Sequence, residues 1–539
     1  MPPSAPVPSS PSSVLMSPDA AAGTHAGHFR RSLSLLDLTM IGFGSIFGSG
    51  WLFAASNVSA IAGPASVISW AIGGLAVLLL GLVFCELGAA LPHAGGVVRY
   101  PAYSHGPLLG FLMGLITVIA FSSLISIEIV AARQYAGAWI PGLTRNAAGD
   151  PTWAGWIVQL AVLAGLLRLN LSPIRTFALF NNIVTVFKFC VPLLVIVVLL
   201  GHMDAGAFTR HGFAPAGGAG IEAAISTGGI IFAYLGLTPI ISVASEVRDP
   251  QRTIPLALTA SVLMATVVYV LLQVAFVGSV PDRLLAGGWA GVAHILALPF
   301  HDIAITVGAL WLATLVVADA IVSPAGTGNI YMSASPRIIY GWARGATFPA
   351  LFARVDRDSG VPRPALYLTF VMAVFWTLPF PSWQALIGVV SSALMMSYAF
   401  APIAAAALRR TAPDLHRPFR LSRMAVMGPL SFIVASLIVY WSGWQTVSWL
   451  LSLQLLLGVG FVAWWGVTKR PGHRGQLRHT GWVLVYFAGM VGLSGTGSFG
   501  GSGILPHPLD DAAVALFALA IYLWAERSGN RVFMDRADL

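Results

Sequence analysis

Long apolar runs, separated by short polar segments, follow one another along nearly the whole chain. Most are long enough to cross the hydrocarbon layer as a helix, which takes roughly 20 residues. The shorter, alternating pattern of barrel strands is absent from the sequence. The runs predicted to span the membrane are residues 33–61, 64–91, 107–140, 153–169, 174–201, 221–245, 255–280, 302–332, 364–380, 383–408, 424–441, 447–467, 482–497 and 509–524. The pattern therefore predicts an all-α polytopic membrane protein with fourteen spans.

The segments between the runs are mostly short. Residues 92–106 and 289–301 are semi-polar and are predicted to be interfacial or re-entrant, and residues 335–363 form the longest predicted loop. Residues 1–32 are rich in Pro, Ser and Ala and lack the apolar centre of a signal peptide, which favours a disordered tail. Residues 526–539 form a second tail.

Apolar residues make up 57% of the chain and charged residues only 9%, with a net charge of +9. The positive charge is accounted for by basic residues that lie mostly on one side of the membrane. Arg145, Arg210 and Arg283 fall in outer segments, and Arg133 and Lys188 lie within spans, whereas the other basic residues occupy segments on the opposite side. The asymmetry predicts cytoplasmic termini and a multi-pass protein of the inner or plasma membrane, with lipid as its surroundings and no nucleic-acid partner.

The stretch G-F-G-S-I-F-G-S-G, residues 42–50, interrupts the first apolar run. Each glycine costs a helix roughly 1 kcal/mol relative to alanine, yet the flanks are too apolar for a loop. Unpaired backbone at this depth is tolerated only where protein or a water-filled cavity receives it, so the break is a candidate binding site. Alternatively, Gly44 and Gly48 form a small-residue face for close helix packing.

A second break lies in the sixth run, where Gly236 and Pro239 follow Phe232. Both breaks occupy the first helix of a five-helix unit, residues 33–201 and 221–408. Paired interrupted helices in corresponding halves indicate the central site of a secondary transporter. Because five is odd, the second unit enters from the opposite side, which predicts a 5+5 inverted repeat. Residues 424–525, carrying four additional spans, lie outside this core.

The motifs around the two breaks resemble those of the amino acid-polyamine-organocation superfamily of permeases. G-S-I-F-G-S-G-W-L-F at residues 44–53 is similar to the first-span pattern, and the aromatic-x-x-x-Gly of residues 232–236 to the sixth-span break. E-V-R-D-P-Q-R-T-I-P at 246–255, and E-L-G with P-H-A-G-G around 86–96, resemble two further motifs. S-P-A-G-T-G at 323–328 and the fourteen spans are most similar to a bacterial branch that includes aspartate-proton symporters. The resemblance implies a LeuT-type fold and amino acid transport.

The breaks also predict how a zwitterion is bound. Amides around Gly48, Ser49 and Gly50, at a half-helix N-terminus, suit a carboxylate. Free carbonyls near Ile46, Phe232, Ala233 and Leu235 suit the ammonium, and the resemblance implies the same positions. Ser45, Gly236 and Thr238 complete the predicted substrate site. Ser45 and Ser49 can alternatively bond back to their own helix.

Two aromatic residues at the second break are candidate gates. The resemblance implies a gating role for Phe232. For Tyr234 core packing is the preferred interpretation. Thr238 stands where arginine-exchanging relatives carry a glutamate, which disfavours a strongly cationic substrate.

The ionisable residues that lie deep within spans, rather than at their ends, are Glu128, Arg133, Lys188 and Asp319. Charge is costly there, so each is a candidate functional residue. Lys188 is one of only two lysines in the chain. The resemblance implies that it takes the place of sodium and binds the coupling proton; a fixed structural cation is the alternative. Glu128 and Arg133 are not expected to pair with each other on one helix. Arg133 either snorkels or meets a substrate carboxylate, and Asp319 either relays protons or is structural.

A further set of charges stands at the predicted cytoplasmic ends of spans two and six. Glu86, Glu246, Arg248 and Arg252 can pair to latch an inner gate, or they form a solvated loop cluster.

These features predict a proton-coupled amino acid symporter that imports its substrate, aspartate or glutamate being the preferred side chains. An amino acid exchanger on the same fold and a non-transporting nutrient receptor are the alternatives. An enzyme is not expected, because no nucleophile with a base and no metal-ligand spacing stands out, and no cofactor is predicted. Cys85 and Cys190 are too few and too deeply placed for a disulfide framework. The sequence leaves the oligomeric state open.

Overall fold

The computed structural model describes residues 33–91, 95–172, 174–234, 236–242, 247–356, 360–467 and 473–530. Within these ranges the chain is helical, and extended pairing is limited to two isolated bridges, Leu33 with Val247 and Thr144 with Pro151. The all-α prediction is confirmed for this part of the chain.

The helices of the first predicted unit are α1 (Leu35–Ile46), α2 (Gly50–Ala62), α3 (Ser66–Ala90), α4 (Gly96–His105), α5 (Pro107–Ala136), α6 (Trp153–Asn170) and α7 (Ile174–Leu200). Those that follow are α8 (Gly217–Ser226), α9 (Ile230–Tyr234), α10 (Leu237–Ser242), α11 (Pro250–Ser279), α12 (Val292–Ile295), α13 (Pro299–Thr306), α14 (Leu310–Arg344), α15 (Arg363–Trp376), α16 (Trp383–Ala399) and α17 (Ala401–Thr411). The last are α18 (Met424–Tyr440), α19 (Trp444–Val467), α20 (His473–Thr496) and α21 (Leu509–Ser528).

Among the described residues, 7 helical segments are long and apolar enough to cross a membrane. An eighth arises if the pair 289–295 and 299–306, which bends by 93°, counts as one span. Such a bend fits the interfacial or re-entrant character predicted for residues 289–301. The chain is thus a multi-span membrane protein, and the number fourteen stays a prediction.

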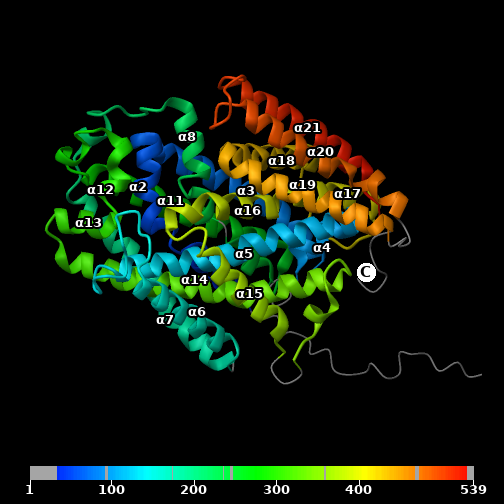
Figure 1. Ribbon diagram of the computed structural model, residues 1–539, viewed down its shortest axis with the longest axis horizontal. Helices are drawn as coiled ribbons and strands as arrows, with labels where there is room; N and C mark the ends of the chain where they lie inside the picture. Colours follow the sequence, from blue (N-terminus) through cyan, green and yellow to red (C-terminus); the bar gives the residue numbers. More distant parts are fainter. Residues whose placement is uncertain are drawn as a thin grey trace, which may run out of the picture.

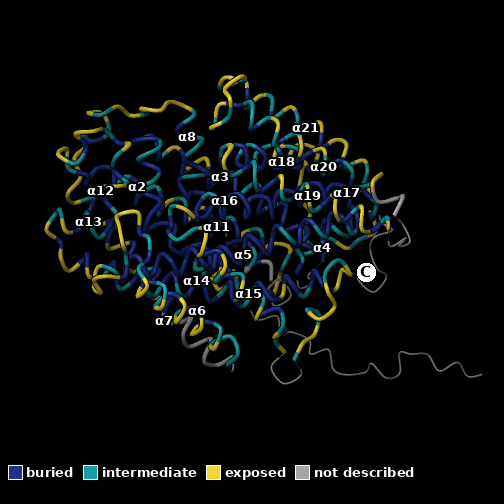
Figure 2. The backbone as a smooth tube through the Cα atoms, viewed as in Figure 1, coloured by how far each residue is buried: buried dark blue, intermediate teal, exposed yellow. Residues whose placement is uncertain are grey.

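Helix α5 forms the centre of the molecule. It packs against α4, α14, α15 and α16, and 89% of its most apolar window is buried. A helix that is apolar on every face lies either in a protein interior or in lipid, and here other helices surround α5. Figure 2 shows the buried backbone gathered in this interior, with exposed segments at the periphery.

Helices α18 to α21 lie side by side along one edge of the molecule, coloured orange to red in Figure 1. Their outer faces expose large apolar side chains, among them Leu456, Val459 and Leu516. Exposed leucine stripes of this kind suit a helix that faces lipid rather than water. The arrangement agrees with additional helices packed outside a core.

Several predicted spans have different bounds in the structure, among them the thirteenth, whose helix α20 begins at His473 rather than at residue 482. The eighth was predicted to begin at Asp302, but that residue belongs to α13, where its carboxylate accepts the Leu298 N–H at 2.9 Å. Gly308, with a φ of 81°, then separates α13 from α14, which continues to Arg344 through the start of the predicted loop. The tenth span is divided at Phe400 into α16 and α17.

Candidate functional site

The first apolar run is interrupted where its glycines predicted a break. Helix α1 ends at Ile46, Phe47 is extended with a φ of −78° and a ψ of 101°, and α2 begins at Gly50. The chain therefore leaves helical geometry for three residues in the interior of the protein.

The sixth run is interrupted twice. Helix α8 ends at Ser226, Gly229 has a φ of 100°, and α9 covers only Ile230–Tyr234 before α10 begins at Leu237. The predicted break at Gly236 thus separates α9 from α10, while Leu235 lies outside the described residues. The left-handed φ of Gly229 explains the extra break, since glycine adopts it without strain.

The two breaks contact each other directly. The Ser45 hydroxyl lies 2.8 Å from the carbonyl oxygen of Gly236 and 2.8 Å from that of Gly42. A β-carbon at Gly236 would stand 2.7 Å from the Ser45 backbone, and one at Gly50 would stand 2.6 Å from the Ala233 side chain. Such distances leave no room for a methyl group, so glycine permits the close approach.

A tyrosine from α11 joins both breaks from a third side. The Tyr269 hydroxyl lies 2.9 Å from the Ala233 carbonyl oxygen and 3.3 Å from that of Ile46. These are two of the carbonyls predicted to meet a substrate ammonium. Each already accepts a hydrogen bond and keeps its second lone pair.

A small cavity lies between the breaks. Its walls come from α1, α2, α5, α9 and α14. The lining residues are Ser45, Ile46, Gly48, Gly50, Leu124, Glu128, Phe232, Ala233, Thr327 and Tyr331. The cavity thus combines the predicted substrate residues of both breaks with one carboxylate from α5.

The carboxylate of Glu128 is hydrogen-bonded to the backbone at the first break. Glu128 is buried, and its carboxylate accepts the Ser49 N–H at 2.8 Å. A β-carbon at Gly48 would stand 2.3 Å from the same carboxylate. The Ser49 hydroxyl in turn accepts the indole N–H of Trp383 at 3.1 Å. A carboxylate already rests where the sequence predicted the carboxylate of a substrate.

Lys188 reaches the first break from α7. Its ammonium donates to the Gly44 carbonyl oxygen at 3.0 Å and to the Thr327 hydroxyl at 2.7 Å. Thr327 lies on α14 and is also 3.2 Å from the Phe47 carbonyl oxygen. One buried cation therefore connects α7, α14 and the first interrupted run. Neither of these contacts is to a carboxylate.

Asp319 lies on α14 two turns before Thr327. One of its oxygens accepts the Ser323 hydroxyl at 2.5 Å, and the other has no hydrogen-bond partner among the described residues. Asp319 does not line the cavity. Asp319 lies on the same helix as Thr327, the hydrogen-bond partner of Lys188. Both the proton-relay role and the structural role of Asp319 stay predictions.

Arg133 is buried but does not line the cavity. Its guanidinium donates to the Gly149 carbonyl oxygen at 2.7 Å, to that of Pro381 at 3.1 Å and to the Gln159 side chain at 3.2 Å. These contacts bind α5 to α6 and to two connecting segments. Arg133 neither snorkels to solvent nor pairs with Glu128, in agreement with the predicted helical spacing.

Of the two aromatic residues at the second break, only Phe232 lines the cavity, with its ring 6.1 Å from that of Trp383. Tyr234 is fully buried and donates to the Trp70 carbonyl oxygen at 2.9 Å, as core packing requires, and its gating role stays a prediction. Thr238 lies outside the cavity, where its hydroxyl is 2.6 Å from that of Tyr398.

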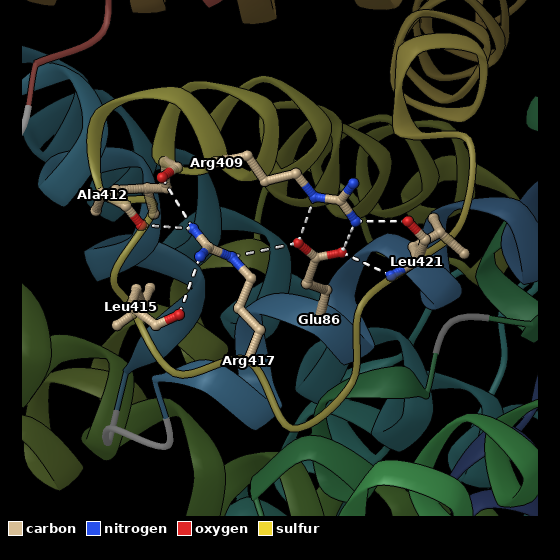
Figure 3. Close-up of polar contacts among 7 residues, drawn as sticks. Glu86, Arg409, Ala412, Leu415, Arg417 and Leu421 are labelled. Atoms are coloured by element: carbon tan, nitrogen blue, oxygen red, sulfur yellow. Dashed lines mark hydrogen bonds and ion pairs between the residues drawn. The ribbon is translucent and has the colours of Figure 1, made fainter.

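The predicted latch around Glu86 has different partners. Figure 3 shows the Glu86 carboxylate between the guanidinium groups of Arg409 and Arg417. The Leu421 N–H also donates to it, at 2.9 Å. Burial lowers the pKa of Arg417, while the neighbouring Glu86 opposes that change. Glu86 thus joins the end of α3 to the end of α17 and the connection that follows.

The other residues predicted for that latch do not meet Glu86. Arg248 and Arg252 are exposed, and the Arg248 N–H donates to the Leu33 carbonyl oxygen at 3.3 Å. Glu246 lies outside the described residues. The Glu86 side chain faces α17 instead, and the exposed arginines fit the alternative of a solvated loop cluster; the latch stays a prediction.

Several residues of the site were not predicted from the sequence. Thr327 belongs to the S-P-A-G-T-G motif, whose small and polar residues are an unusual pattern for a membrane span. Tyr269, Trp383, Arg409 and Arg417 carry no local signal, since each acts through contacts distant in sequence.

A cavity between interrupted helices, lined by backbone polar groups and approached by a buried cation, is the arrangement expected at the central site of a secondary transporter. A sequence model of amino acid permeases matches residues 33–494, and the chain belongs to this family. It is a transporter and not an enzyme.

Two proteins of Bacillus subtilis (strain 168) are similar over most of their length. The aspartate-proton symporter is 50% identical, covering 93% of this chain and 97% of that protein. The glutamate/serine transporter AimA is 36% identical, covering 93% and 94%. Among solved structures, the Eremococcus coleocola manganese transporter shares the fold with a TM-score of 0.51 and 14% identity, over 86% of this chain and 99% of that one.

Proposed function

We propose that this permease is a proton-coupled symporter that imports an acidic amino acid across the inner or plasma membrane. The similarity to an aspartate-proton symporter and to a glutamate/serine transporter supports both the coupling ion and the substrate class. The finer architecture belongs to the same proposal. Two inverted five-helix units, residues 33–201 and 221–408, rock around the cavity, four further helices pack outside, and both termini are cytoplasmic.

The substrate binds between the two breaks. Its carboxylate is held by the N–H groups of Gly48, Ser49 and Gly50, where the dipole of α2 favours negative charge. Its ammonium faces the carbonyl oxygens of Ile46 and Ala233, which accept bonds from Tyr269 and keep a lone pair each. The glycines let both groups approach the backbone closely.

The observation that carries the proposal is the position of Lys188. Its ammonium binds the Gly44 carbonyl oxygen and Thr327, so its charge holds α7 and α14 to the first break. When the proton leaves, the amine loses the charge that makes these bonds strong. Occupation by a proton is thereby linked to the shape of the substrate site.

Glu128 is a second residue through which a bound proton can affect substrate binding. It accepts the Ser49 N–H, at the amides proposed for the substrate carboxylate. Two carboxylates at the same N–H groups repel each other, and a proton on one of them removes the repulsion. Substrate and proton then favour each other's binding, as a symporter requires.

The test is uptake of labelled aspartate into proteoliposomes that contain no internal amino acid, with an imposed pH gradient. The wild-type protein should accumulate aspartate in proportion to the gradient, whereas Lys188→Met should bind aspartate without concentrating it. Arg283→Met is the matched control, because Arg283 is an exposed cation. Glu128→Gln keeps the side-chain shape and should make aspartate binding less dependent on pH.

Accumulation by Lys188→Met equal to wild type would remove the coupling role from this residue. Uptake by the wild-type protein only when internal amino acid is present would identify an exchanger. Binding without any uptake in either condition would identify a receptor.

A further inference from the structure

A second group of ionisable side chains lies far from the cavity, at the junction of α8 with the C-terminal helices. Glu222 belongs to α8, His507 to the connection between α20 and α21, and Asp511 to the first turn of α21. Figure 1 shows α8 and this connection at the same edge of the molecule. Neither the substrate site nor the proposed coupling uses these residues.

One atom from each side chain points to a common place. The Nδ1 atom of His507 lies 3.1 Å from Asp511 Oδ2 and 3.5 Å from Glu222 Oε2, and all three atoms lie within 4.8 Å of one another. The three atoms are shielded from solvent and face one another, and among the described residues none of them makes a hydrogen bond of good geometry to any other group. Buried polar atoms are costly unless they are satisfied, and three that converge at this spacing can be satisfied together by one shared cation.

The surrounding contacts hold the two aspartates of this segment in place. Asp510 is buried, and its carboxylate accepts bonds from the Tyr440 hydroxyl at 2.5 Å and the Ser498 N–H at 3.0 Å. The other oxygen of Asp511 accepts the Trp441 indole N–H at 2.8 Å. Outer contacts of this kind orient ligand groups at metal centres. They leave Asp511 Oδ2 directed toward His507 and Glu222.

We propose that Glu222, His507 and Asp511 bind a transition-metal ion of the Zn²⁺ class. Ligands at ~2.1 Å in a tetrahedron stand about 3.4 Å apart, close to the two separations from His507 Nδ1. An imidazole nitrogen with two carboxylates suits Zn²⁺ or Co²⁺, whereas Ca²⁺ and Mg²⁺ take oxygen ligands. The three side chains are partly exposed, which gives an ion a path of entry and leaves room for a water ligand.

Such an ion would join two parts of the transporter. Helix α8 is followed, after the break at Gly229, by α9, which lines the cavity through Phe232 and Ala233. Helix α21 belongs to the group packed along the edge. A motion of α8 relative to α21 would separate Glu222 from the other two ligands, so the bound ion favours the arrangement described here.

The test measures metal binding by the full-length purified protein in detergent, after treatment with EDTA. Calorimetric titration with Zn²⁺ gives the affinity, and the visible absorption of Co²⁺ reports the number and type of ligands. The variants are His507→Ala and Glu222→Gln, the latter nearly isosteric with the native side chain. His211→Ala is the matched control, since His211 is another histidine paired with one carboxylate, Asp282, at 2.8 Å.

The wild-type protein and His211→Ala should each bind one equivalent of Zn²⁺ with the same affinity. Both ligand variants should bind it at least tenfold more weakly and lose the Co²⁺ absorption. Wild-type binding that is absent, or that survives unchanged in Glu222→Gln, would overturn the proposal. In that case a protonated His507 holds the two carboxylates by ion pairs alone. Because the readout is metal binding, its result is independent of the transport assay above.

Discussion

Replacing Gly236 with alanine tests whether contact between the two breaks holds the site together. The added β-carbon would meet Ser45 and Ile46 backbone atoms at 2.7 to 2.8 Å. Because these atoms belong to the main chain, a side-chain rotation cannot relieve the clash. The two interrupted segments must therefore move apart.

The size of the effect follows from two contributions. Overpacking of a close backbone contact costs about 1–3 kcal/mol. Separation of the segments also breaks the contact between the Ser45 hydroxyl and the Gly236 carbonyl oxygen, which contributes about 1 kcal/mol. We expect the free energy of unfolding to fall by roughly 2–4 kcal/mol.

Gly44 provides a control in the same motif. It lies inside α1, and a β-carbon there meets no atom within 4 Å. Alanine at this position should preserve the site and stabilise the helix by up to about 1 kcal/mol.

The assay is the thermal denaturation of each purified variant in detergent, with and without aspartate. Gly236→Ala should melt at a lower temperature than wild type and lose the shift that aspartate produces. Gly44→Ala should keep both values or melt slightly higher. A Gly236→Ala protein with the wild-type melting temperature and aspartate shift would refute the argument that the two breaks must touch.

Two further predictions concern charges outside the cavity. Glu86→Gln leaves the half-buried guanidinium groups around it without a counter-charge and should lower the free energy of unfolding by about 3 kcal/mol. Asp356→Asn, which removes a more exposed ion pair, should cost less than about 1 kcal/mol in the same melting experiment, and equal losses would contradict this reasoning. Burial lowers the pKa of His105 to about 4, and its Nε2 atom donates to the Ala525 carbonyl oxygen at 2.9 Å. The unfolded chain binds the proton with a pKa of about 6.5, so stability is full above pH 6.5 and falls by up to about 3 kcal/mol as the pH drops to 4. His105→Gln should melt with a smaller dependence on pH over this range, and an unchanged dependence would contradict the assignment.

The breaks were predictable because they are local. Closely spaced glycines in an apolar run weaken a helix, and the predicted breaks lie beside Gly48 and at Gly236. Pro239 lies inside α10, and the further break at Gly229 was not predicted. Lys188 was predictable for a similar reason, since a cation deep in an apolar span must find partners nearby.

The residues that pair with these side chains could not be predicted from the sequence. Whether Glu128 faces Ser49 depends on how α5 is rotated against the first break, and no local pattern reports that rotation. Glu86 and Arg409 are 323 positions apart, so only the packed helices reveal their ion pair. The start of the eighth span was misplaced because Asp302, which caps a short helix, reads as the polar edge of a longer apolar run.

Helix α14 is 35 residues long, or ~52 Å, whereas the hydrocarbon layer is about 30 Å thick. The same rod carries Asp319 and Thr327 beside the lysine and ends at Arg344, well beyond the depth that lipid tails can cover. Arg344 lies ~25 Å along the helix from Thr327, so a tilt of about 5° at the buried contacts would move that far end by about 2 Å. A movement at the centre of the protein is in this way carried to the water boundary along one continuous helix, with Pro336 the place on that path where the helix can bend.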